Sequence, residues 1–287
     1  MSEGIIYYNT GTACCARLLV SAYTLRKHYS GNVTILSEGN ESLEIVPRIA
    51  SAIGVDYKDV KIDVPKGRGQ AYLAKTKLYT ISPYNITVFI DADTIIKGRV
   101  DELFTWAKAY SFVATQMVNW VTQHGIVHRR IKLWERICPE LITQAVQFGK
   151  AVNTGVFGFT KDATILNEWF DLAHRGRNAG MPICDELACQ ILLPHHKNYI
   201  APSDFNCSCR FGNPNSDNVR IVHYHGRKHC RIDKSSNSNP PKLICNGDLW
   251  VKEFIELYSK NVANVRRWAP AGDKVLYIWL KHNRNNI

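Results

Sequence analysis

The feature that most constrains the fold is a strongly strand-forming segment, Ile86-Thr-Val-Phe-Ile90, that stops abruptly at Asp91-Ala92-Asp93. β-Branched and aromatic residues bounded by polar ones are typical of a buried strand. The two carboxylates therefore follow the carboxyl end of that strand. Open α/β sheets place their ligands at this end of their strands, so we expect the acidic pair to face a ligand.

Short β-type runs alternate with helical patterns along the first half of the chain, which is the signature of parallel βαβ units. Clusters of Ser, Asn, Pro and Gly over 210–218 and 233–246 predict surface loops. Neither an internal repeat nor a linker divides the chain. Strands are predicted over 5–9, 32–36, 60–64, 86–90, 156–159 and 220–224, and helices over 18–25, 47–53, 72–81, 163–173, 185–193 and from 249 onward.

The composition excludes several classes of protein. With 287 residues, of which 45% are hydrophobic and 21% charged, the chain is neither disordered, collagen-like nor a coiled coil. Its apolar runs are far shorter than the roughly 18–20 residues that cross a bilayer. Met1–Gly4 lacks the features of a secretory signal, so we expect a cytoplasmic protein. The nine cysteines, spread from Cys14 to Cys245, then favour reduced thiols over disulfides.

The positive charge is concentrated near the end of the sequence. The net charge is +11, and residues 205–287 contribute +8 of it, with 14 Lys and Arg against 6 Asp and Glu. Such a segment could attract nucleic acid, an anionic membrane surface or a phosphorylated small substrate. Charge alone does not choose among them.

Asp91 and Asp93 need compensation, because burying paired negative charges without a cation is costly. Mn²⁺ or Mg²⁺ would supply it, since hard divalent ions prefer carboxylate oxygens together with substrate phosphates. A solvated turn after the strand is the alternative, because Asp is common in turns. The D-x-D spacing alone does not decide between the two.

Other motifs accompany the acidic pair in a defined order. They are Arg68, Lys77, Val88–Thr94, Val100–Phe104, Asn153–Val156, Cys184–Glu186 and Val222–Lys228. Their order and spacing resemble glycosyltransferase family 8, the glycogenin-like retaining sugar transferases, over about residues 5–229. The resemblance implies an α/β, GT-A type, Rossmann-like domain with a mixed, mostly parallel central sheet and a C-terminal helical appendage. We expect the transferase domain over 1–232 and a basic, Trp-containing extension packed on it over 233–287.

The resemblance implies a three-residue metal site. Asp91 and Asp93 match the family's D-x-D pair, in which the first carboxylate also faces the nucleotide ribose and the second holds the ion. His223 matches the histidine of the family's last motif and would be the third ligand. A lone histidine is more often structural, so this role depends on its place in the motif. Because imidazole suits Mn²⁺ better than Mg²⁺, we expect Mn²⁺, with Mg²⁺ as the alternative.

The nucleotide-sugar site implied by the resemblance draws on residues from the whole chain. The strand-end segment before Gly11 matches the family segment that binds the uracil and ribose. Arg68 and Lys77 would face the diphosphate or the sugar. Exposed helix charge, as expected for Lys75, is the alternative for those cations. The predicted nucleotide-sugar-binding residues are Tyr8, Asn9, Thr10, Arg68, Lys77, Asp91, Ala92, Asn153, Thr154, Gly155, Gly226 and Lys228.

Asp185, Glu186 and Lys228 are the predicted catalytic residues. Asp185 matches the acid of the family's D-Q pair, and Glu186 stands where the family has glutamine, which implies a different selectivity for sugar hydroxyls. The family lysine is expected at position 229, where this chain has His229. We favour Lys228 over His229 and Arg227, because the reaction requires a cation on the departing diphosphate.

The predicted function is metal-dependent, retaining transfer of a hexose or related sugar from a UDP-sugar to an acceptor hydroxyl on a glycan or protein. A homodimer is possible. A sugar-phosphate nucleotidyltransferase is one alternative. Such enzymes usually have a glycine-rich basic loop after the first strand, whereas this chain has only Gly11 near that place. A non-enzymatic nucleic-acid binder is another, using a basic patch with one tyrosine, namely Arg220, Tyr224, Arg227, Lys228, Arg231 and Lys234. No recognisable nucleic-acid module accompanies that charge. Trp250, Trp268 and Trp279 are more typical of a core than of a sugar platform.

A structural zinc site is the alternative for the region around His223. The C-x-C pair followed by gaps of 20 and 14 residues lacks the paired C-x₂-C spacing of zinc sites, so buried free thiols are favoured. The candidate zinc ligands are Cys207, Cys209, Cys230, Cys245, His223, His225 and His229.

Overall fold

A seven-stranded mixed sheet forms the centre of the computed structural model, which describes residues 2–39, 43–67, 69–117, 130–209, 211–224, 230–232, 243–245 and 248–272. The strand order is β3-β2-β1-β4-β7-β6-β8, and only β7 runs antiparallel to its neighbours. The strands are β1 (Glu3–Thr10), β2 (Val33–Glu38), β3 (Asp56–Asp59), β4 (Ile86–Ile90), β6 (Phe112–Gln116), β7 (Val152–Thr160) and β8 (Tyr199–Ala201).

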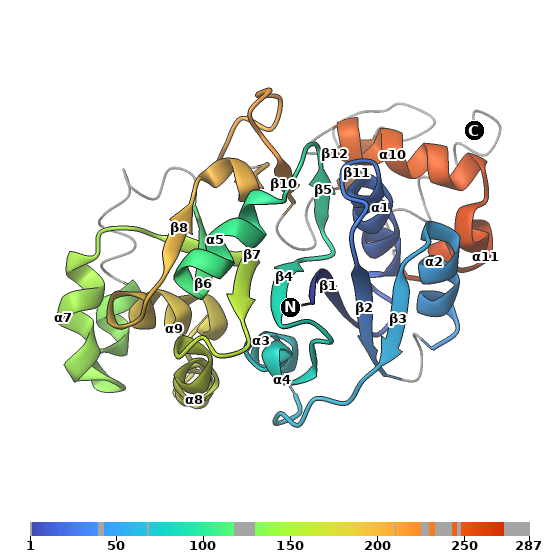
Figure 1. Cartoon of the computed structure of the whole chain (residues 1–287). Helices are drawn as coiled ribbons and strands as arrows, with labels where there is room; N and C mark the ends of the chain where they lie inside the picture. Colours follow the sequence, from blue (N-terminus) through green and yellow to red (C-terminus); the bar gives the residue numbers. More distant parts are fainter. Residues whose placement is uncertain are drawn as a thin grey trace.

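Helices cover both faces of this sheet (Figure 1). Successive residues of β1 point to opposite faces, so that Ile5 and Tyr7 join one hydrophobic core and Ile6 joins the other. The first core is closed by α1 (Cys15–Arg26), α2 (Ile45–Ile53) and α5 (Glu102–Tyr110). The second core is closed by α3 (Gln70–Thr76), α4 (Leu78–Ile81), α7 (Pro139–Gln147), α8 (Ile165–Asn178) and α9 (Cys184–Leu192).

The order of the strands creates a topological switch point between β1 and β4. The chain leaves β1 toward β2 and β3 on one side, and later returns to β4 on the other side. Ligands of open α/β sheets bind in the crevice outside the carboxyl ends of the strands at such a point. All five residues of β4 are buried, so Asp91 is the first residue of this strand's continuation that reaches the crevice.

Two small sheets accompany the central one. β5 (Thr94–Ile96), β10 (Ile221–His223) and β9 (Cys207–Ser208) form a three-stranded sheet, in which β10 is antiparallel to β5 and parallel to β9. β11 (Cys230–Ile232) pairs antiparallel with β12 (Leu243–Cys245). Only three residues separate the end of β4 from the start of the three-stranded sheet, which therefore brings distant segments to the acidic pair.

The C-terminal helices pack against the first core. α10 (Asp248–Ser259) and α11 (Val265–Gly272), separated by the short 3₁₀ helix η6 (Val262–Asn264), lie beside α1 and α2 (Figure 1). Trp250 and Trp268 are buried there as core residues, whereas Trp279 lies outside the described residues. None of the helices in the described part of the chain combines the length and apolar composition needed to cross a membrane.

Most predicted elements are present, with three differences. The predicted strand over 60–64 is wrong. The third strand is instead β3, an exposed edge strand with the polar sequence DYKD. Ile62 and Val64, which suggested the strand, are buried without pairing to another strand. The predicted helix over 72–81 is divided into α3 and α4 at Lys77, whose φ and ψ of −105° and 7° are not helical. Residues 243–245, predicted as loop, form β12.

Candidate active site

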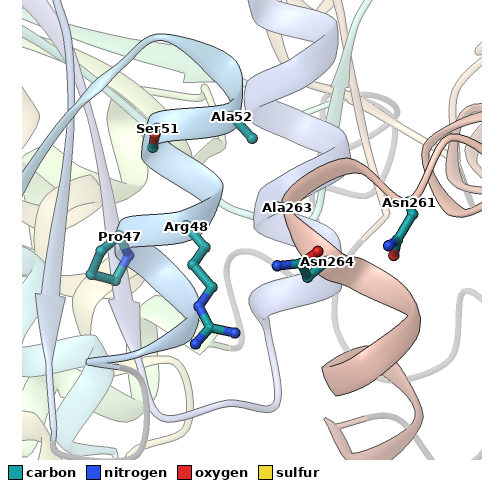
Figure 2. A pocket seen from close by; sticks show the side chains of 7 residues that line it. All are labelled: Pro47, Arg48, Ser51, Ala52, Asn261, Ala263 and Asn264. Carbon is teal, nitrogen blue, oxygen red and sulfur yellow. The ribbon is translucent and has the colours of Figure 1, made fainter.

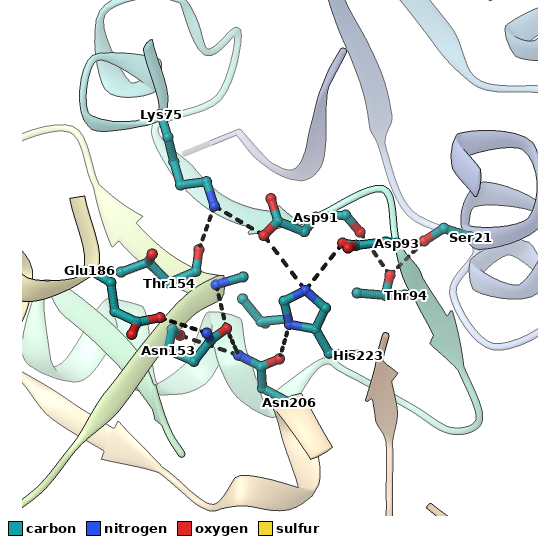
Figure 3. Close-up of polar contacts among 12 residues, drawn as sticks. Ser21, Lys75, Asp91, Asp93, Thr94, Asn153, Thr154, Glu186, Asn206 and His223 are labelled. Carbon is teal, nitrogen blue, oxygen red and sulfur yellow. Dashed lines mark hydrogen bonds and ion pairs between the residues drawn. The ribbon is translucent and has the colours of Figure 1, made fainter. Parts of the chain in front are cut away.

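Asp91, Asp93 and His223 converge beyond the end of β4 (Figure 3). One possible ligand atom from each residue lies within 4.8 Å of the others. His223 Nε2 is 3.1 Å from Asp93 Oδ1 and 3.8 Å from Asp91 Oδ2. The pairing of β5 with β10 creates this proximity, because it sets His223 opposite Thr94 although the two residues are far apart in sequence.

A hydrogen bond between Nδ1 and the side chain of Asn206 fixes the orientation of the His223 ring. The side-chain amide of Asn206 donates to Thr115 Oγ1 at 2.7 Å and to the main-chain oxygen of Asn153 at 3.2 Å. Since that main-chain oxygen can only accept, the Asn206 oxygen is left to accept from His223 Nδ1 at 2.8 Å. A proton on Nδ1 leaves Nε2 able to coordinate an ion beside Asp93.

Gly155 provides the space for this ring. A Cβ atom built at Gly155 would lie 2.2 Å from His223 Cε1 and 2.5 Å from Nδ1, so no other residue fits without moving the imidazole. The glycine in the predicted Asn153-Thr154-Gly155 element therefore admits the histidine.

An irregularity in the sheet places these polar residues. The pairing of β6 with β7 changes register between Ala114 and Thr115, so that Ala114 faces Phe157 and Thr115 faces Asn153. β-Bulges of this kind redirect side chains and are common next to active sites. Asp91 then lies against the bulge, where its main-chain N–H donates to the Gly155 carbonyl at 2.7 Å.

These residues fit a divalent cation. Two carboxylates and one imidazole whose second nitrogen is held by an amide form a donor set suited to such an ion. Burial raises the pKa of Asp91, and Asp93 raises it further, although Lys75 opposes this effect. Burial lowers the pKa of His223, but Asp93 and Asp91 together raise it above its ordinary value. The site is thus rich in negative charge and attracts a cation.

Lys75, on α3, is the cation that the structure brings to the acids. Its Nζ donates to Asp91 Oδ2 at 3.0 Å and to the Thr154 carbonyl at 3.3 Å (Figure 3). It also lies 3.8 Å from Asp185 Oδ2. Burial lowers the pKa of Lys75, but Asp91 and Asp185 raise it above its ordinary value, so the amine is charged. Lys77, predicted for the site, instead donates to the Asp63 carbonyl and lies 4.0 Å above the Phe170 ring.

Asp185 and Glu186 lie in the first turn of α9, next to the metal cluster. Asp185 is 2% exposed and accepts from Thr154 Oγ1 at 3.1 Å, while its Oδ1 has no hydrogen-bond partner among the described residues. Such an orphaned buried oxygen is suited to a ligand hydroxyl. Asn153 Nδ2 donates to Glu186 Oε2 at 2.6 Å. Burial, and then the charge of Asp185, raise the pKa of Glu186 to about 7.

The strand-end segment of β1 lies across the switch point from the acids. Tyr8 donates to Glu38 Oε2 at 2.7 Å, which links the ends of β1 and β2. Asn9 is 1% exposed, and its amide donates to the Gly11 carbonyl at 3.0 Å. That leaves Asn9 Oδ1 buried without a hydrogen-bond partner in the described residues, while Thr10 is exposed. This segment could accept a donor group from a base or ribose.

The structure brings most of the predicted site residues together around one centre. The predicted residues at this centre are Asp91, Ala92, Asp93, Asn153, Thr154, Gly155, Asp185, Glu186 and His223. Arg68, Gly226 and Lys228 lie outside the described residues. The sequence analysis missed Lys75, Asn206 and Thr115. Asn206 and Thr115 belong to no motif, and Lys75 was assigned to the helix surface because its distance from Asp91 in space is invisible in the sequence.

The alternatives to this site receive little support from the described residues. Cys207 is buried and Cys209 is half-buried, and neither forms a disulfide. The candidate metal-binding cluster of the described residues contains neither cysteine. The β11–β12 register sets Cys230 opposite Cys245, while His225 and His229 are not described. Tyr224, proposed for a nucleic-acid surface, is 3% exposed and cannot stack on a base.

A separate cavity of about 450 Å³ lies between α2 and η6 (Figure 2). It shares no residue with the acidic centre. Its lining mixes polar and apolar side chains, and consists of Pro47, Arg48, Ser51, Ala52, Asn261, Ala263 and Asn264.

The fold is that of known sugar transferases. Mouse xyloside xylosyltransferase 1, in its apo form, superposes with a TM-score of 0.55 at 12% identity, over 78% of this chain and 98% of that one. The galactosyltransferase LgtC, in complex with donor and acceptor sugar analogues, gives a TM-score of 0.52 at 16% identity, over 78% of this chain and 87% of that one. No protein-family model and no curated protein sequence matches the chain. The predicted GT-A type, Rossmann-like fold is confirmed.

Proposed function

We propose that the chain is a metal-dependent, retaining glycosyltransferase, similar to family 8, that transfers a hexose or related sugar from a UDP-sugar to an acceptor hydroxyl. The observation that carries the proposal is the convergence of Asp91, Asp93 and His223 at the switch point of a sheet shared with two sugar transferases. A hard cation held by two carboxylates and an imidazole is suited to binding a nucleotide diphosphate.

The nucleotide is proposed to span the switch point. Tyr8, Asn9 and Thr10 would hold the uracil and ribose, with the unpartnered Asn9 Oδ1 accepting a base or ribose donor. Asp91 and Asp93, with His223, would hold Mn²⁺, or Mg²⁺ as the alternative. When bound, the ion would neutralise the negative charge that develops on UDP as the sugar leaves.

The donor sugar is proposed to lie beside α9. Asp185 Oδ1 is free to accept from a sugar hydroxyl, and Thr154 holds the other oxygen in place. Glu186, oriented by Asn153, would stabilise the positive charge that develops on the sugar ring or would orient the acceptor. Lys75 orders the carboxylates of Asp91 and Asp185, and thereby aligns the diphosphate and sugar ends of the site.

Three residues outside the described part of the chain complete the proposal. Lys228 would neutralise the departing diphosphate, Gly226 would allow close backbone approach, and Arg68 would contact the donor. A glycan or a protein hydroxyl is the proposed acceptor. Retention of anomeric configuration follows from the family resemblance.

A panel of UDP-sugars tests the proposal without knowledge of the acceptor. With Mn²⁺ present, we expect slow release of UDP from one or a few donors, because water replaces the missing acceptor. Asp93→Ala should abolish the release. Absence of hydrolysis and of Mn²⁺-dependent UDP binding would contradict the proposal. Release of pyrophosphate from UTP and a sugar phosphate would instead identify a nucleotidyltransferase.

A further inference from the structure

Lys75 and the predicted metal ion would share one carboxylate oxygen of Asp91. Asp91 Oδ2 lies 3.0 Å from the Lys75 ammonium and 3.8 Å from His223 Nε2. The same oxygen therefore belongs to the metal-binding cluster and is already neutralised by a lysine. A divalent ion held between Asp91 and His223 would lie within a few ångström of a fixed positive charge.

Lys75 is held in this position from several sides. Its side chain is 11% exposed, its Nζ donates to the Thr154 carbonyl at 3.3 Å, and Asp185 lies 3.8 Å away. Moving the ammonium out would leave Asp185, which is 2% exposed, as a buried charge without its cation. Uncompensated buried charges are strongly destabilising, so the amine stays near Asp91 while an ion binds.

We infer that Lys75 keeps the affinity of this site for a free divalent ion low, so that the ion binds together with a nucleotide diphosphate. Like charges a few ångström apart repel strongly in a partly buried site. The diphosphate brings the negative charge that offsets both the ion and the lysine. The inference rests on the proposed function, because it assumes that the ion and the nucleotide occupy the same centre.

The inference makes Lys75 a positioning residue with a measurable thermodynamic signature. If binding of the ion and of UDP is coupled, each ligand raises the affinity for the other by the same factor. Removing the lysine charge should strengthen binding of the ion alone, and should therefore reduce that coupling factor. A lysine that only supports the local structure would not change the coupling in this direction.

Titration of Mn²⁺ followed by electron paramagnetic resonance tests the inference, with and without UDP. For Lys75→Gln we expect Mn²⁺ alone to bind at least about tenfold tighter than in the wild-type protein, because a neighbouring like charge is removed. The enhancement by UDP should shrink correspondingly. Lys77→Gln is the matched control: it removes the same charge two residues away, where the amine contacts Asp63 and Phe170 instead of the acids.

Lys75→Gln leaves the buried Asp185 without its cation and could therefore misfold. The comparison is repeated in a protein that also carries Asp185→Asn. An asparagine at position 185 carries no charge and needs no neighbouring cation. The single variant Asp185→Asn is therefore compared with the double variant Lys75→Gln/Asp185→Asn. Circular dichroism and thermal melting verify that each variant is folded. Tighter Mn²⁺ binding in either background supports the inference.

Unchanged or weaker Mn²⁺ affinity of folded Lys75→Gln in both backgrounds would overturn the inference. So would wild-type Mn²⁺ binding that is equally tight with and without UDP. In either case Mn²⁺-dependent turnover of a UDP-sugar by the wild-type protein would leave the proposed function standing. If the wild-type protein neither binds UDP with Mn²⁺ nor turns over a UDP-sugar, the proposed function fails together with the inference.

Discussion

The two halves of the proposed site, one for the metal ion and one for the donor sugar, are built in different ways. The metal half, Asp91, Asp93 and His223, depends on strands: the end of β4 and the pairing of β5 with β10. The sugar half, Lys75, Asp185 and Glu186, depends on helices α3 and α9, which pack on the sheet. Strand register is fixed by which face of the strand is buried, whereas a helix changes the direction of a side chain by about 100° per residue.

This difference determines how each half tolerates change. The metal half holds its geometry through backbone pairing and through the Asn206 amide behind His223. The sugar half holds its geometry through side-chain pairs, chiefly Lys75 with Asp91 and Asp185. We therefore expect substitutions in the metal half to remove function without unfolding the protein, and substitutions in the sugar half to alter stability and pH dependence as well.

The largest expected effect is that of Asp93→Ala on turnover. Loss of one carboxylate ligand should reduce Mn²⁺-dependent release of UDP at least about 10³-fold, because an ion contributes several kcal/mol to leaving-group stabilisation. The free energy of unfolding should stay equal or rise, since two crowded negative charges become one. Parallel activity assays and denaturant titrations measure both. Retention of most of the turnover would show that Asp93 does not hold the ion.

The second-largest expected effect is that of Gly155→Ala on Mn²⁺ affinity, because this glycine leaves the space that the His223 ring occupies. In Gly155→Ala the new methyl group would lie 2.2 Å from His223 Cε1, so the ring must move. We expect Mn²⁺ affinity in the presence of UDP to fall about 10–100-fold, as when the groups that orient a metal ligand are lost.

Gly158→Ala is the control for this substitution on the same strand, β7. Its Cβ would first meet atoms at 3.4 Å, and these belong to α5 instead of the site. It should leave Mn²⁺ affinity unchanged. Equal affinities of the two variants would contradict the assigned role of Gly155.

The third effect concerns the pH dependence contributed by Glu186 in the sugar half. Its pKa is raised to about 7, so the folded protein holds a proton that the unfolded chain releases at lower pH. The stabilisation by this proton is fully present below the ordinary glutamate pKa and is lost as the pH rises through about 7. Glu186→Gln should therefore be about as stable as the wild-type protein near pH 4.5 and more stable, by about 3 kcal/mol, near pH 8.

Thermal melts of both proteins between these pH values, without divalent ions, measure this difference. Asp185 remains in place in both, so the comparison isolates one carboxyl. A stability difference that does not vary with pH would show that Glu186 is ionised in the folded protein throughout the range.

The smallest expected effect is that of Lys77→Gln. Its amine makes one exposed hydrogen bond and lies over the Phe170 ring, interactions that contribute about 0.5 kcal/mol. Denaturant titration should show a loss of that size, and Mn²⁺ affinity should not change. A clear loss of Mn²⁺ or UDP affinity would return Lys77 to the site that the sequence analysis assigned to it.

The sequence predicted the strand-borne part of the site well for a physical reason. A buried strand that ends in two carboxylates is visible as a run of apolar residues, and the structure places β4 over the predicted residues 86–90. The alternation of strands and helices likewise indicated the mostly parallel sheet. The partner of the acids, His223, was found through its motif.

The helix-borne part could not be predicted in the same way. Lys75 and Lys77 are the same residue type, but two positions along a helix differ in direction by about 200°, and only Lys75 contacts the acids. The change in register at Thr115 and the amide of Asn206 depend on tertiary packing and leave no local pattern. The edge strand β3 was misplaced because its sequence, DYKD, is polar and shows no apolar alternation that would mark a strand.

The central claim is that the acidic pair and His223 hold one ion that also binds the diphosphate of a nucleotide. Pulsed electron paramagnetic resonance of Mn²⁺ bound with UDP tests it most directly. We expect hyperfine coupling to one imidazole nitrogen and to phosphorus on the same ion, with the nitrogen signal absent in His223→Asn. A bound Mn²⁺ that couples to phosphorus but to no histidine nitrogen, or to neither nucleus, would contradict the claim.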